Sequence, residues 1–205
     1  MKTIKVSNYD CWEDYYWEYQ NLLAKEYYIP YLEKQNVNLK GNILDIGCGD
    51  GGFTCAFSIS KRSLGIDVKN FLWSKETDKI SFKTHNILSD DNKNYIGKYD
   101  LIILRDVIEH IHKKDKDRFM RRAMSFLKSD GEMLVTFPPY RSPFGLHQQA
   151  IMKSFLKYIP FLSLLPKSIL RKIINKFESE NIWIDIEEII DSGITISDFK
   201  KISEK

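Results

Sequence analysis

The stretch ILDIGCGDGG, residues 43 to 52, decides the fold. A short apolar run leads directly into glycines, and a helical pattern follows from Phe53 to Ser58. Gly47 and Gly49 permit a tight turn and let a ligand approach the backbone closely. The free N–H groups at the start of the helix attract an anionic group. The stretch therefore predicts a strand, a turn and a helix that bind a nucleotide-like ligand.

Four more short apolar runs predict strands that alternate with helical or loop segments. Continuous apolar runs are typical of strands buried on both faces, so we expect an α/β fold whose mainly parallel sheet has helices on both faces. The helix after the fourth strand is expected to bury a face from Phe119 to Leu127 and to end at the SDG of residues 129 to 131. The four runs are residues 63 to 66, 80 to 83, 100 to 104 and 132 to 137.

The segments around the sheet differ in composition. Residues 1 to 40 are rich in aromatic side chains at helical spacing, with a kink expected at Pro30, and predict a helical cap. Residues 41 to 140 form the ligand-binding core, and residues 141 to 205 a helical insertion or lid followed by a C-terminal helix. We expect these three parts to make one domain.

Bulk composition excludes several classes of protein. The net charge of +3 over 205 residues gives no general attraction to nucleic acid. The three cysteines lack the spacing of a zinc site or a disulfide framework, so we expect no metal and a cytoplasmic location. No apolar run is long enough to predict a transmembrane segment.

The glycines alone leave two ligands open. Gly47, Gly49 and Gly52 also fit the G-x-G-x-x-G pattern of dinucleotide-binding proteins, which would suit an NAD-dependent oxidoreductase. Asp45 precedes the first glycine by two residues, and a carboxylate there suits a ligand with an ammonium group better than a pyrophosphate. With Asp45 included, the stretch resembles the D-x-G-x-G-x-G motif of class I, Rossmann-like S-adenosylmethionine-dependent methyltransferases. The resemblance covers roughly residues 41 to 139.

This resemblance implies a set of cofactor-binding residues along the carboxyl edge of the sheet. Asp67 would hydrogen-bond the ribose hydroxyls, Val68 would flank the adenine, and Asn86 and Ile87 would contact its edge. Arg105 and Asp106 would lie beside the methionine end of the cofactor. The implied set is Asp45, Gly47, Cys48, Gly49, Asp67, Val68, Asn86, Ile87, Arg105 and Asp106.

Methyl transfer depends mainly on the alignment of the nucleophile with the methyl group, so few catalytic residues are needed. A hydroxyl or protonated amine acceptor also needs a general base, for which His110 and His147 are the candidates. A purely structural role for either histidine stays open. The expected acceptor is an O or N atom of a small molecule, a glycan precursor or a lipid-linked compound.

Other functions remain as alternatives. One is a non-catalytic module that keeps cofactor binding or only the fold. Nucleic acid is a less favoured substrate, because Phe137 replaces the polar residue of the D/N-P-P-Y motif that binds a target amine. Residues 150 to 177 are basic and apolar without any acid, which suits a packed insertion, a lid over the strand ends or a contact with a lipid interface.

The family resembled has seven strands, and we expect strands six and seven to be missing here, in a shortened chain or a natural variant. Residues 195 to 205 read as the start of the final helix. The alternation of Ile182, Ile184 and Ile186 could replace one strand, although residues 187 to 191 read better as helix. Without a replacement, the fifth strand is an open edge that self-associates or is covered by the helices of residues 150 to 191.

Overall fold

The computed structural model describes residues 4 to 204, which form two compact units, each built from two stretches of chain. The first unit contains the chain up to Arg105 together with Arg121–Val135. The second contains Asp106–Met120 and the chain from Thr136 onwards. The predicted division of one domain into three parts, with boundaries near residues 40 and 140, stays a prediction.

A five-stranded sheet with the order β3-β2-β1-β4-β5 confirms the predicted Rossmann-like α/β class. β1 pairs in parallel with β2 and with β4, and β2 pairs in parallel with β3. Hydrogen bonds from Tyr99 N to Phe126 O and from Asp106 N to Thr136 O join β4 and β5 start to start and end to end, so β5 is also parallel. The strands are β1 (Asn42–Ile46), β2 (Arg62–Asp67), β3 (Ile80–Thr84), β4 (Tyr99–Arg105) and β5 (Leu127–Thr136).

The predicted boundary between the helix and the fifth strand was wrong. Helix α4 (Lys116–Ser125) ends before residue 127, and β5 begins at Leu127 instead of residue 132. Gly131 lies inside the strand, where a Cβ atom would come within 2.7 Å of the Tyr99 carbonyl oxygen. This glycine therefore permits a close approach of two backbones, and its neighbours Ser129 and Asp130 do not form a stop signal.

The N-terminal helices continue through Pro30. Helix α1 (Trp12–Leu23) passes into a π-helical turn, η2 (Ala24–Tyr28), and then into α2 (Ile29–Lys34). Because Pro30 has no N–H group, the turn before it cannot complete the ordinary α-helical bonds, and the wider turn lies where the sequence predicted a kink.

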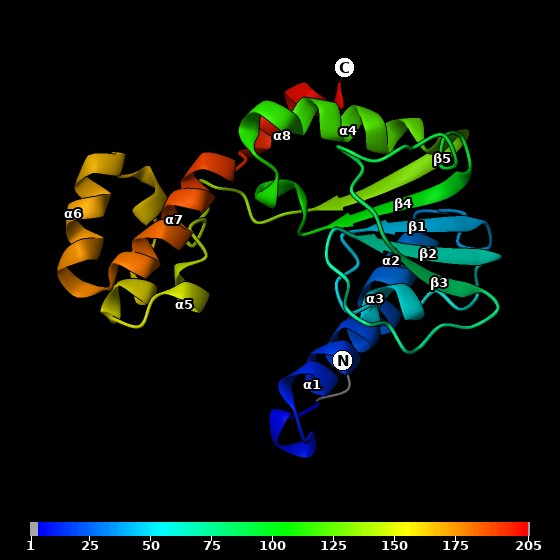
Figure 1. The fold of residues 1–205 in the computed structure, drawn as a ribbon, viewed down its shortest axis with the longest axis horizontal. Helices are drawn as coiled ribbons and strands as arrows, with labels where there is room; N and C mark the ends of the chain where they lie inside the picture. The colour runs from blue at the N-terminus through cyan, green and yellow to red at the C-terminus, as the bar shows by residue number, and fades with distance from the viewer. Residues whose placement is uncertain (1–3, 205) are drawn as a thin grey trace. The chain divides into compact units, whose positions relative to one another are not determined.

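One hydrophobic core joins these helices to the sheet of the first unit, and Figure 1 shows α1, α2 and α3 gathered on one side of β1 to β3. Helix α3 (Gly52–Cys55) is shorter than the predicted helix of residues 53 to 58. The buried core residues are Ala24, Leu32, Leu39, Ile43, Phe53, Ala56, Phe57, Leu101 and Ile103.

The second unit is helical and has a core of its own. Its longer helices are α6 (Lys167–Phe177), α7 (Glu180–Ser192) and α8 (Ile196–Ser203), preceded by the short α5 (Gln148–Ile151). The 3-10 turns are η3 (Ile108–His110), η4 (Lys113–Asp115), η5 (Phe155–Tyr158) and η6 (Leu162–Leu164), and a further turn in the first unit is η1 (Val6–Asn8). The buried core residues are Leu146, Met152, Leu156, Leu162, Leu170, Ile174, Trp183 and Ile186.

The described residues contain no strand after Thr136, as expected for a sheet without strands six and seven. Residues 182 to 186 do not replace a strand, because they lie within α7, where Trp183 and Ile186 are buried at helical spacing. Neither self-association through β5 nor a lid formed by residues 150 to 177 is tested, and both stay predictions. Within residues 4 to 204, no helix combines the length and apolar composition needed to cross a membrane.

Candidate functional site

The turn after β1 has the backbone conformation that its glycines predict. Gly47, Gly49 and Gly51 have φ angles of 78°, 54° and 85°, in the left-handed region that other residues rarely adopt. A Cβ atom on Gly49 would meet no protein atom within 4 Å. The turn therefore leaves open space directly beside its backbone.

Asp67, at the end of β2, fixes this turn to the neighbouring strand. One carboxylate oxygen, Oδ2, accepts a hydrogen bond from Gly49 N at 3.0 Å, and the other accepts one from Lys69 N at 2.9 Å. The Ile66 carbonyl oxygen also accepts bonds from the N–H groups of Gly47 and Cys48. The structure thus brings together Asp67 and the glycines that the sequence assigned to one site.

Asp45 lies below the turn, at 3% exposure, and is not a surface residue. Its Oδ2 accepts a 2.6 Å hydrogen bond from the Thr54 hydroxyl group on α3. Burial raises the pKa of the Asp45 carboxyl to about 6, although the Thr54 bond and the nearby Arg105 guanidinium both act to lower it. Asp45 therefore links the strand to the helix that follows the glycines, and part of the Asp45 population is protonated near pH 6.

Helix α1 supports the same turn from a distant part of the sequence. Asn21 Nδ2 donates a hydrogen bond to the Gly52 carbonyl oxygen at 2.9 Å. A Cβ atom on Gly52 would lie 2.4 Å from the backbone oxygen of Trp17, so the helix can approach only because this residue is glycine. Sequence reasoning missed Asn21, because its partner lies 31 residues away and no local pattern marks it.

Arg105 ends β4 and also reaches α1. Its guanidinium donates to Gln20 Oε1 at 2.5 Å and lies over the Phe53 ring, 4.7 Å from its centroid. Gln20 is buried and gave no signal in the sequence. The residue after Arg105, Asp106, belongs to the second unit, so the structure does not place the two in one compact unit.

The remaining predicted cofactor residues have different environments. Cys48 is buried, and burial raises the pKa of its thiol, which stays protonated. Val68 is 63% exposed. Asn86 Oδ1 accepts a bond from Leu88 N within its own turn. Ile87 is buried, and its carbonyl oxygen accepts bonds from the Asn92 amide and the Arg122 guanidinium.

Trp73 is a contact residue that the sequence did not reveal. The segment between β2 and β3 contains no helix, and Trp73 Nε1 from this segment donates a 2.8 Å hydrogen bond to the Gly49 carbonyl oxygen. Its ring stacks on Phe82 of β3, with centroids 5.4 Å apart and planes 12° apart. The indole therefore binds the carbonyl group of Gly49, the residue whose N–H group bonds to Asp67.

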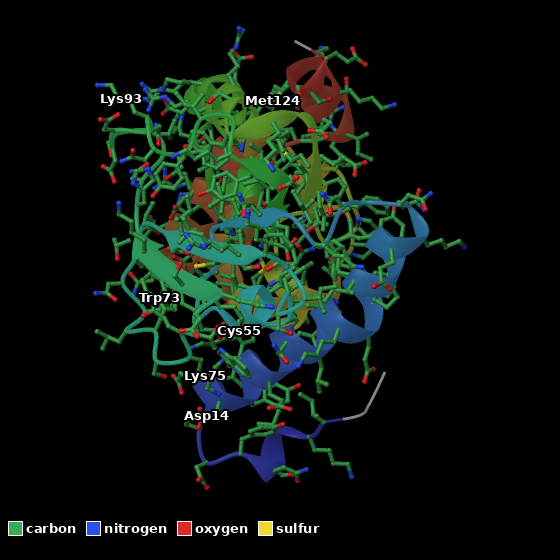
Figure 2. All side chains as sticks on the ribbon, turned by 90° about the vertical axis from the view of Figure 1, so that its right-hand side faces the viewer. Asp14, Cys55, Trp73, Lys75, Lys93 and Met124 are labelled. Atoms are coloured by element: carbon green, nitrogen blue, oxygen red, sulfur yellow. The ribbon has the colours of Figure 1, made fainter. Side chains whose placement is uncertain are left out.

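Next to Trp73 lies a cavity of about 140 Å³ that also borders α1. Figure 2 shows Asp14, Lys75, Trp73 and Cys55 close together, far from Lys93 and Met124. The Lys75 ammonium group lies 3.6 Å from the centroid of the Trp17 ring. Aromatic faces attract cations, and here a lysine of the same chain lies over one of the N-terminal aromatic rings, that of Trp17.

The two candidate base residues lie together in the second unit. The rings of His110 and His147 are 6.1 Å apart, edge to face. His147 is half-buried at the start of α5, and burial, followed by the nearby His110, lowers its pKa below the ordinary value for histidine, while Asp106 acts in the opposite direction. The Asp106 carboxylate accepts a bond from the Thr136 hydroxyl group. His147 is therefore mainly neutral at pH 7 and able to accept a proton.

A family model described as "Methyltransferase domain" matches residues 16–179, which is most of the chain. The chain belongs to the methyltransferase domain family. The match includes the glycine turn, Asp67 and both candidate histidines, so it covers residues of both units.

Curated relatives match at lower identity and over part of their length. A phosphoethanolamine N-methyltransferase of Plasmodium falciparum is 28% identical over 109 residues, 49% of this chain and 40% of the relative. A methoxy mycolic acid synthase of Mycobacterium tuberculosis is 24% identical over 172 residues, 78% of this chain and 55% of the relative. The chain thus spans about half the length of these relatives or less.

Solved structures of methyltransferases share the fold. Magnesium protoporphyrin IX methyltransferase of Synechocystis, solved with bound SAH, superposes with a TM-score of 0.54 at 17% identity, over 98% of this chain and 77% of that chain. The plantazolicin methyltransferase, also in complex with SAH, gives a TM-score of 0.51 at 14% identity, over 93% of this chain and 62% of that chain.

Proposed function

We propose that this methyltransferase-family chain binds S-adenosylmethionine at the glycine turn after β1 and transfers its methyl group to an O or N atom of an acceptor. The observation that carries the proposal is the pair formed by Asp67 and Gly49, with open space beside the glycine backbone. Two structural neighbours are solved with SAH, which agrees with this cofactor.

Within this proposal the residues of the turn have distinct roles. Asp67 accepts hydrogen bonds from the ribose hydroxyls, and Gly47 and Gly49 let the ligand approach the backbone. Cys48 lines the turn as a neutral side chain. Asp45 and Thr54 keep the turn in place through their buried bond. When bound, the cofactor supplies an electrophilic methyl group on a sulfonium.

The other predicted cofactor residues keep their assignments as proposals. Val68 is exposed and offers an apolar side chain to the adenine, and Asn86 and Ile87 offer polar groups to its edge. Arg105, held against Gln20, contributes positive charge for the carboxylate of the methionine moiety. Asp106, the next residue in the chain, keeps its predicted place beside the methionine end.

The structural observations favour this cofactor over NAD. The Asp67 carboxylate is bonded to the turn, and the buried Asp45 carboxyl is close enough to interact with it, so negative charge at the turn opposes the binding of a pyrophosphate. The curated relatives include a phosphoethanolamine N-methyltransferase and a methoxy mycolic acid synthase. They support a small-molecule or lipid-linked acceptor, while the cytoplasmic location stays a prediction.

The test of the proposal is a calorimetric titration of the 205-residue chain with S-adenosylhomocysteine and, separately, with NAD. We expect one equivalent of S-adenosylhomocysteine to bind with micromolar affinity and NAD to give no measurable heat. Binding of NAD alone would support the oxidoreductase alternative, and binding of neither would support a module that keeps only the fold.

We further propose that a ring nitrogen of His147 accepts the proton that the acceptor loses. The structure motivates a measurement on this histidine: its pKa, followed by the proton NMR signals of the imidazole, is expected below about 6.5. Replacing His110 by Gln removes a neighbouring imidazole that helps to lower the pKa of His147, and should raise that pKa. His112→Gln is the control, because His112 is exposed and is not among the groups that shift His147.

An ordinary or raised pKa for His147 would contradict this assignment, since the imidazole would then be largely charged at mildly acidic pH. The sign for stability follows from the same shift. Because the folded-state pKa is lowered, the stability from a neutral His147 is fully present above about pH 6.5, the ordinary pKa of histidine, and is lost as the pH falls below it through the lowered folded-state pKa.

A further inference from the structure

The segment from Phe155 to Phe177 in the second unit leaves an unusual number of large apolar side chains at the surface. Its inner side chains, such as Leu156, Leu162 and Leu170, already fill the core of the unit. Six other side chains, between 44% and 68% exposed, do not belong to that core. Single exposed apolar residues are common on protein surfaces, but six within one segment are not. They are Phe155, Tyr158, Phe161, Leu164, Ile169 and Phe177.

Phe161 has an exposed side chain and a strained backbone conformation. Phe161 has a φ angle of 63°, in the left-handed region that an aromatic residue rarely adopts. Its N–H group donates to Pro143 O at 2.6 Å, and the fully buried Gln148 donates from Nε2 to Ile159 O at 3.0 Å. Such strain persists where the surroundings hold it and is typical of functional sites.

Positive charges share the surface with these apolar side chains. Phe155 contacts Phe177 with ring centroids 5.0 Å apart, which joins η5 to the end of α6. Lys176 lies over the Phe177 ring at 5.4 Å, and Lys157 lies over the Tyr158 ring at 5.0 Å. The aromatic rings and the ammonium groups are therefore neighbours and not separate patches.

Helix α6 divides its cations between two faces. Lys167 and Arg171 form ion pairs with acidic residues of α7. On another face, Ile169, Lys172 and Lys176 follow the i, i+3, i+7 spacing of one exposed helix stripe. In the part of the chain that the structure describes, no carboxylate forms an ion pair with Lys157, Lys172 or Lys176.

We propose that this surface, formed by the outward side chains of Phe155 to Phe177, docks on the interface of a lipid bilayer that contains anionic lipids. Exposed aromatic and aliphatic side chains enter the headgroup region, and unpaired lysines are attracted to the negative leaflet. A second copy of the chain fits less well, because two identical basic surfaces would repel each other. The proposal concerns the second unit alone and does not depend on the methyl acceptor.

The test is sedimentation of the full 205-residue chain with vesicles of phosphatidylcholine and phosphatidylserine at a molar ratio of about 7 to 3. We expect binding that weakens at least about tenfold on phosphatidylcholine alone and in high salt. The triple variant Lys157→Gln, Lys172→Gln, Lys176→Gln should bind roughly 100-fold more weakly, at about fivefold for each lysine. The double variant Phe161→Ser, Leu164→Ser should weaken binding to both kinds of vesicle.

The matched control is Lys34→Gln, Lys61→Gln, Lys79→Gln, three exposed lysines of the first unit, which removes the same charge and should leave vesicle binding unchanged. Equal losses in the two triple variants, or unchanged binding in the first, would overturn the proposal. The proposal would also be overturned if the chain bound no vesicles and light scattering showed a dimer that Phe161→Ser abolishes. Circular dichroism of each variant reports on folding, and calorimetry with S-adenosylhomocysteine reports separately on the proposed cofactor site.

Discussion

Asp67→Ala is expected to weaken the binding of S-adenosylhomocysteine by at least about tenfold, because it removes charge-assisted hydrogen bonds to the ribose. It also removes the carboxylate that holds Gly49 N and Lys69 N, so the glycine turn loses its link to β2. Both effects act in the same direction on affinity. Titration calorimetry of the variant and the original chain measures the ratio directly.

Two further variants separate these effects. Asp78→Ala removes an exposed carboxylate of the same connecting segment and should bind as the original chain does. Asp67→Asn keeps an oxygen that can accept the bond from Gly49 N but loses the negative charge, so we expect an intermediate affinity. Unchanged binding by Asp67→Ala, with its fold intact by circular dichroism, would show that Asp67 does not bind the ribose.

Gly52→Ala is expected to lower the free energy of unfolding by about 3 kcal/mol. The added methyl group would lie 2.4 Å from the Trp17 carbonyl oxygen, and backbone atoms cannot move aside as a flexible side chain can. Helix α1 would have to shift, which would also strain the bond from Asn21 to the Gly52 carbonyl oxygen. Urea denaturation followed by circular dichroism measures the change.

Gly49→Ala is the matched comparison for this prediction. Its methyl group would meet no protein atom within 4 Å, and only the φ angle of 54° opposes it. We therefore expect a smaller loss, about 1 to 2 kcal/mol. If Gly49→Ala destabilised the chain more than Gly52→Ala, the close contact with α1 would not be the reason why residue 52 has to be glycine.

The sequence predicted the parallel sheet because buried strands are recorded locally, as continuous apolar runs such as Leu101 to Leu104. The predicted start of β5 was wrong because a glycine such as Gly131 occurs both in turns and at close backbone contacts inside strands. Which of the two applies depends on the Tyr99 carbonyl oxygen, 32 residues earlier in the chain, which the local pattern does not contain.

The same distinction applies to the candidate site. Gly49 and Asp67 could be paired from the sequence, because Gly49 follows β1, Asp67 ends β2, and parallel neighbouring strands end at one edge. Gln20, Asn21 and Trp73 could not, since their partners Arg105, Gly52 and Gly49 lie 24 to 85 residues away and are chosen by packing. The burial of Asp45 and its bond from the Thr54 hydroxyl group were equally invisible in the motif.

The division of each unit into two stretches of chain has a consequence for synthesis on the ribosome. Residues 106 to 120 emerge before β5, yet they belong to a unit whose remaining residues begin at Thr136. Ile108 is buried in the finished chain and its turn η3 contacts α7, so this part of the unit cannot be completed until Glu180–Ser192 have been made. The nascent chain therefore cannot complete one unit before it has begun the other, and the two are expected to mature together.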